Sequence, residues 1–228
     1  MTASGQLARV DSHAAVTQGS KRSKHDAIAV VVKTSTRQDI GFVTSHGKVH
    51  RIHAADVPSF GDAFDASQSV TAQEFLGLPK DERILTLIEL NEKAELALGT
   101  EQGVVKRVVA DYPAKDEFEV ITLKDGDKVV GAALATDSST LVFVSSDAQL
   151  LHYSAASVRP QGRPAGGVAG INLDEAAKVI YFGAVENAAS AVVVTAANSS
   201  LSIPGTDAGS LKISDLGEFP GKGRATGG

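Results

Sequence analysis

The sequence predicts an all-β protein built from repeated four-stranded blades, as in a propeller, and two observations support this. First, a short turn phrase recurs along the chain, with its glycine position at residues 5, 47, 103, 148 and 198. The intervals are 42, 56, 45 and 50 residues, the length that one four-stranded blade occupies. Second, β-branched apolar runs alternate with short polar turns between the phrases, and no stretch of a dozen residues keeps a helical period. Such units cannot bury their faces alone, so we expect them to stack around a common axis.

The repeated phrase is typical of a tight turn followed by a basic side chain. Its first three copies have Thr at the start, Gly in the turn and Arg four residues after the glycine. The fourth copy has Ala148 at the glycine position, and the fifth has Asn198, a residue that tolerates positive φ at low cost. The five copies are Thr2–Arg9, Thr44–Arg51, Thr100–Arg107, Ser145–His152 and Thr195–Ser202.

The apolar runs predict further hairpins. Each run is followed, after a short polar turn, by the strand that enters the next phrase, and we expect the two to pair. The expected pairs are Ala27–Lys33 with Asp39–Thr44, Ile84–Leu90 with Glu95–Thr100, Val129–Ala135 with Thr140–Ser145, and Lys178–Val185 with Ala191–Thr195. Residues 72–82 are the nearest candidate for a helical turn.

These units predict a single domain over residues 1–228, with repeats at about 1–38, 39–94, 95–140, 141–190 and 191–228. The fifth repeat is incomplete, so we expect the ring to close by exchange of a strand between neighbouring units or by joining of the two chain ends. Both ends look like cuts in a longer polypeptide, because Met1 lies inside the first phrase and Gly228 lies in a glycine-rich turn.

The composition excludes several kinds of site. The 228 residues are 43% apolar but contain no run of 18 apolar residues and no start typical of a signal peptide, so we expect a soluble, intracellular protein without membrane contact. Without cysteine, the chain has no disulfide, thiolate zinc site or cysteine nucleophile. His46, His50 and His53 would face together only on a helix, whereas Gly47 places them in a hairpin, so a metal site is not expected.

Charge is distributed unevenly along the sequence. The formal net charge is −5, yet residues 1–60 hold eight Lys or Arg against four acids, a local +4 that leaves −9 for the remainder. Five of the six histidines also lie in this basic part. The asymmetry indicates one cationic face on an otherwise acidic body.

Three stretches follow one another in a distinctive order: Phe42–Ile52 with Ala54–Pro58 after it, then Leu96–Arg107, then Val158–Ile171. In this order they resemble the second blade, the third blade and the glycine-rich loop of the fourth blade in the carboxy-terminal β-pinwheel domain of the A subunit of bacterial type IIA topoisomerases, meaning DNA gyrase and topoisomerase IV. The resemblance extends over essentially the whole chain. It implies an all-β, propeller-like β-pinwheel of about five four-stranded blades.

The first blade of gyrase normally carries a basic heptapeptide, Gln-x-Arg-Gly-Gly-x-Gly, on which DNA wrapping depends. The matching segment here keeps Gln18 and the cations Lys21, Arg22 and Lys24 but lacks the paired glycines. A degenerate heptapeptide resembles topoisomerase IV, so the resemblance favours that enzyme over gyrase. A second basic, glycine-rich stretch, Phe219–Gly228, stands where the family has its fifth-blade loop.

We expect the cations of the phrases and loops to bind phosphates of double-stranded DNA without reading its bases. Glycine beside a cation lets a main-chain amide approach a phosphate, as at Gly162 and Gly223. The candidates are Arg9, Lys21, Arg22, Lys24, Lys48, Arg51, Lys106, Arg107, Arg159, Arg163, Lys222 and Arg224.

Other interpretations stay open. Arg9, Arg51 and Arg107 share strand parity with apolar residues and could instead pair with a carboxylate at a blade edge. The loop at residues 159–164 contains two prolines that could simply shape a turn. In a rival interpretation the whole chain is a protein-binding propeller scaffold without DNA contact, and its contact surface consists of three phenylalanines. These are Phe60, Phe64 and Phe75.

The resemblance implies a non-catalytic domain that binds and bends DNA and positions a duplex for strand passage in an ATP-dependent topoisomerase. It implies no cofactor in this domain, with ATP and Mg²⁺ in other parts of the holoenzyme. The partners implied are double-stranded DNA, the catalytic N-terminal region of the same subunit, which carries the DNA-cleaving tyrosine, and an ATPase B subunit. The location implied is the bacterial cytoplasm, at the nucleoid.

Overall fold

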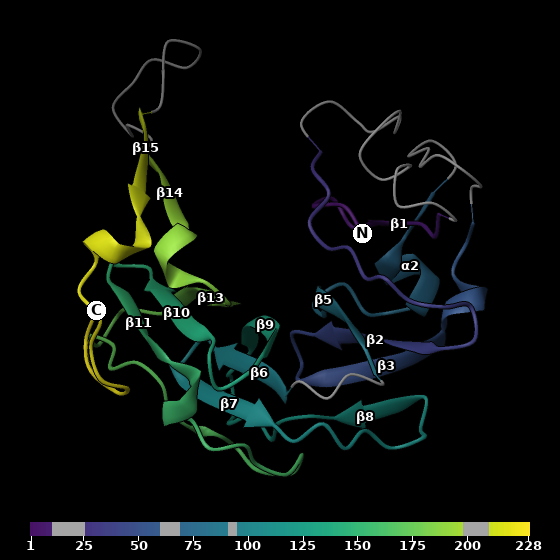
Figure 1. The fold of residues 1–228 in the computed structure, drawn as a ribbon. Coiled ribbons are helices and arrows are strands. Elements are labelled where there is room, and N and C mark those ends of the chain that lie inside the picture. Colours follow the sequence, from purple (N-terminus) through teal and green to yellow (C-terminus); the bar gives the residue numbers. More distant parts are fainter. Residues whose placement is uncertain (11–25, 60–68, 91–94, 198–209) are drawn as a thin grey trace.

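The computed structural model describes residues 1–10, 26–59, 69–90, 95–197 and 210–228, which form antiparallel sheets arranged in a curved array (Figure 1). The strands are β1 (Gln6–Leu7), β2 (Asp39–Thr44), β3 (Lys48–His53), β4 (Val70–Thr71), β5 (Ile84–Glu89), β6 (Glu95–Thr100), β7 (Val104–Val108), β8 (Glu117–Glu119), β9 (Val129–Ala135), β10 (Thr140–Ser145), β11 (Leu150–Ser154), β12 (Val168–Ala169), β13 (Val179–Val185), β14 (Val192–Ala197) and β15 (Ser210–Asp215). The all-β prediction is confirmed.

The helices are short. Helix α2 (Ala72–Leu76) lies where a helical turn was predicted; Thr71 and Glu74 form a capping box at its start, and Gly77 ends it in the left-handed conformation. Four 3₁₀ turns complete the set: η1 (Ala54–Asp56), η2 (Ala155–Ser157), η3 (Ala188–Ser190) and η4 (Leu216–Glu218). No helix among the described residues is long and apolar enough to cross a membrane.

Four copies of the repeated phrase have the same turn. Gly5, Gly47 and Gly103 have φ of 86°, 71° and 83°, and Ala148 has φ of 64°. In each turn the amide of this residue donates to the carbonyl three residues earlier, at 3.0 to 3.1 Å. The left-handed conformation explains the preference for glycine, and Ala148 adopts it without that freedom. The fifth copy, at Asn198, lies outside the described residues.

The predicted strands exist except Ala27–Lys33, which has only an isolated bridge at Ile28, and the expected pairing was wrong. Strand β2 pairs with β5, β6 with β9 and β10 with β13, so an apolar run pairs with the strand of its own phrase and not with the next one. The short β5–β6 connection leads instead from one sheet to the sheet that packs on it, and Ile88 and Leu90 share a buried cluster with Leu96 and Leu98. Strands that are apolar on both faces bury more apolar surface when their sheets pack face to face than when the strands only pair at their edges.

Neighbouring repeats exchange strands. The sheets have the orders β5-β2-β3-β8, β12-β7-β6-β9 and β11-β10-β13, with two-stranded pairs β14-β15 and β1-β4. Strand β8 follows β7 in sequence yet pairs with β3 of the preceding sheet, and β12 pairs with β7 in the same way. Two described sheets therefore have the four strands expected of a blade, and each owes its outermost strand to the following repeat.

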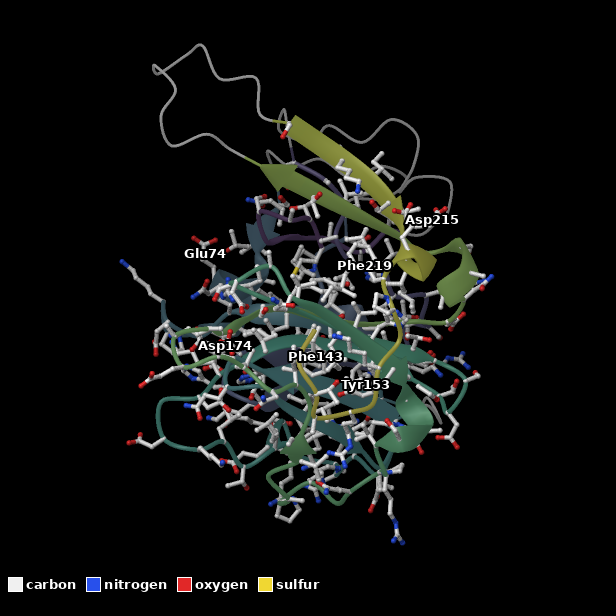
Figure 2. All side chains as sticks on the ribbon, turned by 90° about the vertical axis from the view of Figure 1, so that its left-hand side faces the viewer. Glu74, Phe143, Tyr153, Asp174, Asp215 and Phe219 are labelled. Atoms are coloured by element: carbon white, nitrogen blue, oxygen red, sulfur yellow. The ribbon has the colours of Figure 1, made fainter. Side chains whose placement is uncertain are left out.

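The innermost strands lie together. Strand β9 contacts β5 on one side and β13 on the other, and Figure 1 shows these three toward the middle of the array. Three buried clusters lie between successive sheets, and the side chains of Phe143 and Tyr153 stack within one of them (Figure 2). The opposite side of each sheet, beyond β3, β7 and β11, forms the periphery.

Candidate nucleic-acid interface

The periphery of the array consists of three chain segments, which we call the outer edge. Strand β8 lies beside β3, residues 159–169 lie beside β7, and residues 219–228 lie beside β11. The last segment is placed by bonds from the Lys222 amide to the His152 carbonyl, 3.3 Å, and between His152 Nε2 and the Phe219 carbonyl, 2.9 Å. Figure 2 shows this segment, in yellow, running from Phe219 across the side of the molecule that faces the viewer.

Residues 159–169 form a cationic part of the outer edge. The segment contains Arg159 and Arg163 and no acidic residue. Arg159 is exposed, and the Arg163 guanidinium lies 5.9 Å from the centroid of the Phe118 ring. Gly167 has φ of 81°, and a Cβ there would lie 2.6 Å from the Val105 carbonyl oxygen, so only glycine lets this loop close onto β7.

Residues 219–228 are also cationic and adjoin the first segment. They contain Lys222 and Arg224 and no acid. Arg224 Nη1 donates to the Ala169 carbonyl at 2.6 Å, and the Ala225 amide donates to the Gly170 carbonyl at 2.9 Å. The two acid-free segments thus meet and form a continuous stretch of the outer edge with four cations.

The outer edge beside β3 differs in charge. Strand β8 presents Glu117 and Glu119, which lie opposite His50 and Lys48 on β3. Lys48 Nζ donates to Glu117 at 2.7 Å, and this hydrogen bond raises the pKa of Lys48. The expectation that Lys48 binds phosphate is therefore not supported by its surroundings, because a carboxylate already neutralises the ammonium.

Two arginines of the repeated phrase pair with carboxylates, which is the structural alternative to phosphate binding that their place in the strand allowed. Arg107 is 1% exposed; it pairs with Glu95 at 2.9 Å and Asp137 at 2.7 Å and also donates to two main-chain carbonyls. Arg51 donates to Asp39 at 2.7 Å and to the Pro113 carbonyl at 2.8 Å. The prediction that Arg107 contacts phosphate is therefore wrong, because its side chain is buried. Arg51 already donates to a carboxylate and a carbonyl, which leaves it little capacity to bind a phosphate.

Lys106 is a second correction. Its side chain is fully buried, and Nζ donates to the carbonyls of Val120, Arg163 and Ala165 at 2.8, 2.7 and 2.6 Å. Burial, with the nearby Arg163 charge, lowers the pKa of Lys106 to about 8. A buried ammonium cannot reach DNA, but this one holds the backbone of the loop that carries Arg163. The sequence carried only a faint signal, a lysine with valines two residues before and two residues after it on the same face of its strand.

The remaining predicted residues fall into two groups. Arg9 is half-buried, and its Nε lies 3.4 Å from the Val57 carbonyl oxygen. Phe75 packs into the core, 6.5 Å from Phe42 between ring centroids, so it is not the exposed contact that the protein-scaffold interpretation requires. The others lie outside the described residues: Lys21, Arg22, Lys24, Phe60 and Phe64.

His53 lies apart from the other two histidines of the predicted hairpin. His53 Nδ1 accepts the Ala55 amide at the start of η1, whereas His46 and His50 lie within 3.8 Å of the buried Glu82. Among the described residues no group of three or more His, Cys, Asp or Glu is arranged to hold a metal ion.

Comparisons with known proteins agree with this architecture. A family model described as the DNA gyrase C-terminal domain, β-propeller, matches residues 119–136, 139–186 and 205–228. The DNA gyrase A subunit of Staphylococcus epidermidis is 29% identical over 170 residues, 72% of this chain and 19% of the relative. That of Mycobacterium tuberculosis is 27% identical over 218 residues, 91% of this chain and 24% of the relative. The chain thus spans a quarter or less of the length of these relatives.

A solved structure has the same fold. The crystal structure of the C-terminal domain of DNA topoisomerase IV superposes with a TM-score of 0.79 over 99% of this chain and 69% of that one, at 19% identity. The ordered phrases, the strand-exchanged sheets, the family match and the gyrase relatives agree on one likeness: the chain resembles the C-terminal β-propeller, or β-pinwheel, domains of type IIA topoisomerase A subunits.

Proposed function

We propose that this domain is a non-catalytic module that binds and bends double-stranded DNA along its outer edge, beside β7 and β11. The observation that carries the proposal is the continuous acid-free stretch formed by residues 159–169 and 219–228, with Arg159, Arg163, Lys222 and Arg224. Cations on a curved edge neutralise successive phosphates and favour a bent duplex. The DNA would therefore lie mainly against the sheets that contain β7 and β11.

The contact does not read bases. Phosphate contacts position a protein on DNA but carry no sequence information. Sequence is read by side chains, often on a helix, that contact base edges in the major groove. Among the described residues the longest helix is α2, with five residues, and it does not belong to the outer edge. We therefore expect similar affinity for unrelated duplexes.

A salt titration with matched variants tests the proposal. For wild-type protein the logarithm of affinity should fall linearly with the logarithm of salt concentration, with a slope of about −0.9 for each neutralised phosphate. The double variants Arg159→Ala with Arg163→Ala, and Lys222→Ala with Arg224→Ala, should each bind more weakly and with a slope shallower by up to about 2.

The control removes the same charge elsewhere. Lys124 and Lys178 are exposed and precede the inner strands β9 and β13, so Lys124→Ala with Lys178→Ala should leave the slope nearly unchanged. Equal losses in all three double variants would show that only overall charge matters. A flat salt plot for the wild type would favour the protein-scaffold interpretation instead.

We further propose a topoisomerase IV-like role, with attachment and bending of DNA but incomplete wrapping. The support is the heptapeptide position near Gln18, which keeps its charge but lacks paired glycines and lies outside the described residues. Relaxed plasmid closed in the presence of the domain should keep little positive writhe after protein removal. Strong retained writhe would indicate gyrase-like wrapping, and its loss in the Lys222→Ala, Arg224→Ala variant would place the cause at residues 219–228.

In the intact enzyme, the proposed partners are an ATPase B subunit, with ATP and Mg²⁺ outside this domain, and the catalytic region of the same polypeptide. The domain's own contribution is then to position the duplex for strand passage in the bacterial cytoplasm, at the nucleoid. Strand passage by holoenzyme carrying the Arg159→Ala, Arg163→Ala change should fall while ATP hydrolysis without DNA stays unchanged.

A further inference from the structure

The turn at residues 162–165, which carries Arg163, is held to the rest of the chain through its carbonyl groups. Its own main-chain bond, from the amide of residue 165 to the carbonyl of residue 162, closes the turn and does not attach it to a sheet. The carbonyls of the last three residues of the turn all accept hydrogen bonds from outside it. The donor side chains are Lys106 and Thr122, which we call the two anchors.

The first anchor, Lys106, joins the turn to the exchanged strand β8. Its ammonium has three protons and three carbonyl partners. Two partners belong to the turn, Arg163 at 2.7 Å and Ala165 at 2.6 Å, and the third is Val120, just after β8, at 2.8 Å. A Cβ on Gly167 would lie 3.2 Å from the Lys106 Cβ, so this glycine leaves room for the lysine. Every proton of the buried ammonium is therefore used to fix main chain.

The second anchor, Thr122, holds the same turn from an exposed position. Its Oγ1 donates to the Pro164 carbonyl at 2.9 Å, and its amide donates to the Ala165 carbonyl at 3.4 Å. Substitutions of exposed residues usually change stability little. Because Thr122 is exposed, its hydroxyl can be removed without disturbing the core. It offers a way to loosen the turn in an otherwise folded chain.

The anchors determine where the Arg163 guanidinium lies. Its main-chain carbonyl is bonded to Lys106, and its guanidinium lies 5.9 Å from the centroid of the Phe118 ring on β8. A guanidinium stacked on a ring keeps the N–H groups of its rim available for a phosphate. Its restricted freedom also lowers the entropy cost of that contact. The turn therefore presents an arginine that is already placed for an anion.

Arg159, at the other end of the same loop, is held differently. Two main-chain bonds attach residue 161 to the end of β7: its amide donates at 2.8 Å, and its carbonyl accepts at 3.0 Å. Neither bond involves an anchor. A change at the anchors should therefore displace Arg163 and leave Arg159 in place.

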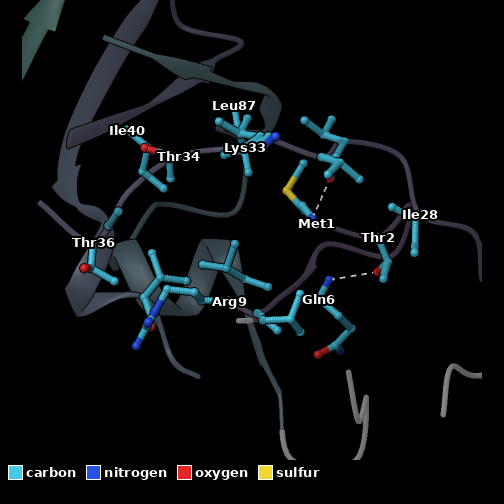
Figure 3. Close-up of a pocket in the computed structure, with 18 of the residues that line it drawn as sticks. Met1, Thr2, Gln6, Arg9, Ile28, Lys33, Thr34, Thr36, Ile40 and Leu87 are labelled. Carbon is cyan, nitrogen blue, oxygen red and sulfur yellow. Dashed lines mark hydrogen bonds between the residues drawn. The ribbon is translucent and has the colours of Figure 1, made fainter. Parts of the chain in front are cut away.

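Only the third of the five copies of the repeated phrase has a lysine at this position. The corresponding residues of the other copies are Ala8, His50, Leu151 and Leu201. His50 Nδ1 lies 3.6 Å from a Glu117 carboxylate oxygen on β8. Ala8 precedes Arg9 on the wall of the pocket that Figure 3 shows, and its methyl group has no proton to donate to a carbonyl. The lysine anchor is thus specific to the sheet with a cationic outer edge.

We propose that Lys106 and Thr122 are positioning residues for DNA binding, which hold the turn at residues 162–165 so that Arg163 contacts a phosphate. The inference rests on the proposed function and specifies how one cation of the acid-free stretch is placed for the duplex. Loss of either anchor frees carbonyls of the turn and lets Arg163 leave the Phe118 ring. The affinity for DNA then falls through Arg163 and not through a direct contact of the anchor.

A matched pair of variants of the full chain tests this. Thr122→Val removes the hydroxyl and keeps the shape of the side chain, whereas Thr122→Ser keeps the hydroxyl. Each is made alone and together with Arg163→Ala, so that a double-mutant cycle measures the coupling of the two sites. Duplex affinity and its salt slope are measured for every variant, and thermal melting shows that each is folded.

The buried anchor is tested by Lys106→Met, measured below its own melting temperature. Lys178→Met is the control, because it removes the charge of an exposed lysine that precedes the inner strand β13. If Lys106→Met does not fold, the Thr122 pair still decides the matter.

Thr122→Val should weaken DNA binding about threefold and Lys106→Met about five- to tenfold, with salt slopes shallower by up to about 1, the share of one phosphate. Thr122→Ser and Lys178→Met should stay within about 1.5-fold of wild type. In the Arg163→Ala background, Thr122→Val should have no further effect. In the free protein, the NMR resonance of the Arg163 Nε–H, which lies near the Phe118 ring, should move in Thr122→Val and not in Thr122→Ser.

Equal affinity of Thr122→Val and wild type overturns the proposal, even when Arg163→Ala binds weakly. An undiminished effect of Thr122→Val in the Arg163→Ala background also overturns it, because the hydroxyl would then act by another route. Both outcomes leave the proposed function standing. A wild-type chain without salt-dependent binding instead overturns the proposed function, and this inference with it.

Discussion

The outer edge beside β3 and the outer edge beside β7 occupy the same place in two successive sheets but have opposite charge. At the first, β8 brings Glu117 and Glu119 against Lys48 and His50. At the second, residues 159–169 bring two arginines and no acid, and Lys106, which stands where His50 stands in its phrase, is surrounded by carbonyls. The strand that a repeat receives from its neighbour therefore decides the charge of its edge.

This difference separates architecture from function. The phrase residues hold the sheets together, as Arg107 and the turn glycines show, and most of them are unavailable to a ligand. The exchanged segments carry the exposed side chains. Within one repeated fold, the ability to bind an anion can then vary from sheet to sheet without any change in the turns or the core.

The largest expected effect tests the lysine that anchors the cationic edge. Lys106→Met keeps the aliphatic volume but leaves three buried carbonyls without their donor, so the free energy of unfolding should fall by about 2–3 kcal/mol. Lys48→Met removes a partly exposed pair and should cost less than about 1 kcal/mol. Urea unfolding of both variants measures the contrast, and equal losses would contradict the structural role of Lys106.

The same lysine predicts a pH dependence. Its pKa is about 8 in the folded chain against an ordinary value of 10.5, so between these values the folded state binds fewer protons than the unfolded state. Burial of the ammonium costs stability below pH 8, and this cost disappears as the pH rises. The stability of wild-type protein relative to Lys106→Met should therefore increase from about pH 7.5 to about pH 9.5. A constant difference would place the folded pKa near its ordinary value.

A second effect concerns the turns that exchanged segments cover. A Cβ on Gly103 would lie 2.8 Å from the Ile171 carbonyl oxygen, whereas a Cβ on Gly5 would meet nothing within 4 Å, although both glycines have positive φ. Gly103→Ala should cost about 2 kcal/mol or more, and Gly5→Ala about 1 kcal/mol. Thermal unfolding of the two variants separates backbone strain, common to both, from the clash with the exchanged segment.

A third effect would convert one edge into the other. Glu117→Gln with Glu119→Gln removes the acids that face Lys48, so DNA affinity at low salt should rise about tenfold. Asp125→Asn with Glu186→Gln changes the net charge equally at exposed sites away from the outer edge. If both double variants gain the same affinity, the position of the acids is irrelevant and the comparison of the two edges fails.

The smallest effect is in the fourth turn. Ala148 has φ of 64°, a conformation that glycine adopts at lower cost. Ala148→Gly should therefore stabilise the chain by about 0.5–1 kcal/mol, opposite in sign to the change at Gly103. An unchanged or lower midpoint in urea would show that the unfolded state gains as much from the substitution as the turn does.

Much of the fold could be predicted because its signals are local. The strand bounds Asp39–Thr44, Glu95–Thr100, Val129–Ala135 and Thr140–Ser145 agree with the structure at both ends, and the turn phrase marks four of its turns. Pairing could not be predicted, because a short polar connection fits a hairpin and a passage between stacked sheets equally well. Only the face-to-face packing of residues such as Ile88 and Leu98 distinguishes the two.

The candidate site was predictable only in part, for a related reason. Arg159, Arg163, Lys222 and Arg224 lie in loops whose composition is visible in the sequence. The partners of Lys106 are main-chain carbonyls. Every residue has a main-chain carbonyl, so no sequence pattern indicates which ones a lysine will contact. The number of charged residues could be counted from the sequence. Whether a charged side chain is exposed and can bind a phosphate depends on contacts between two repeats, which the sequence does not show.

The exchange of strands has a consequence for biosynthesis. The sheet that contains β3 is complete only when β8 has been made, because Lys48 pairs with Glu119, some 70 residues further along the chain. At translation rates of about 5–20 residues per second, that edge of the nascent sheet stays open for several seconds. Each blade must therefore wait for the next repeat to emerge from the ribosome, and a stall between repeats would present the same unpaired edge to any neighbouring chain or chaperone.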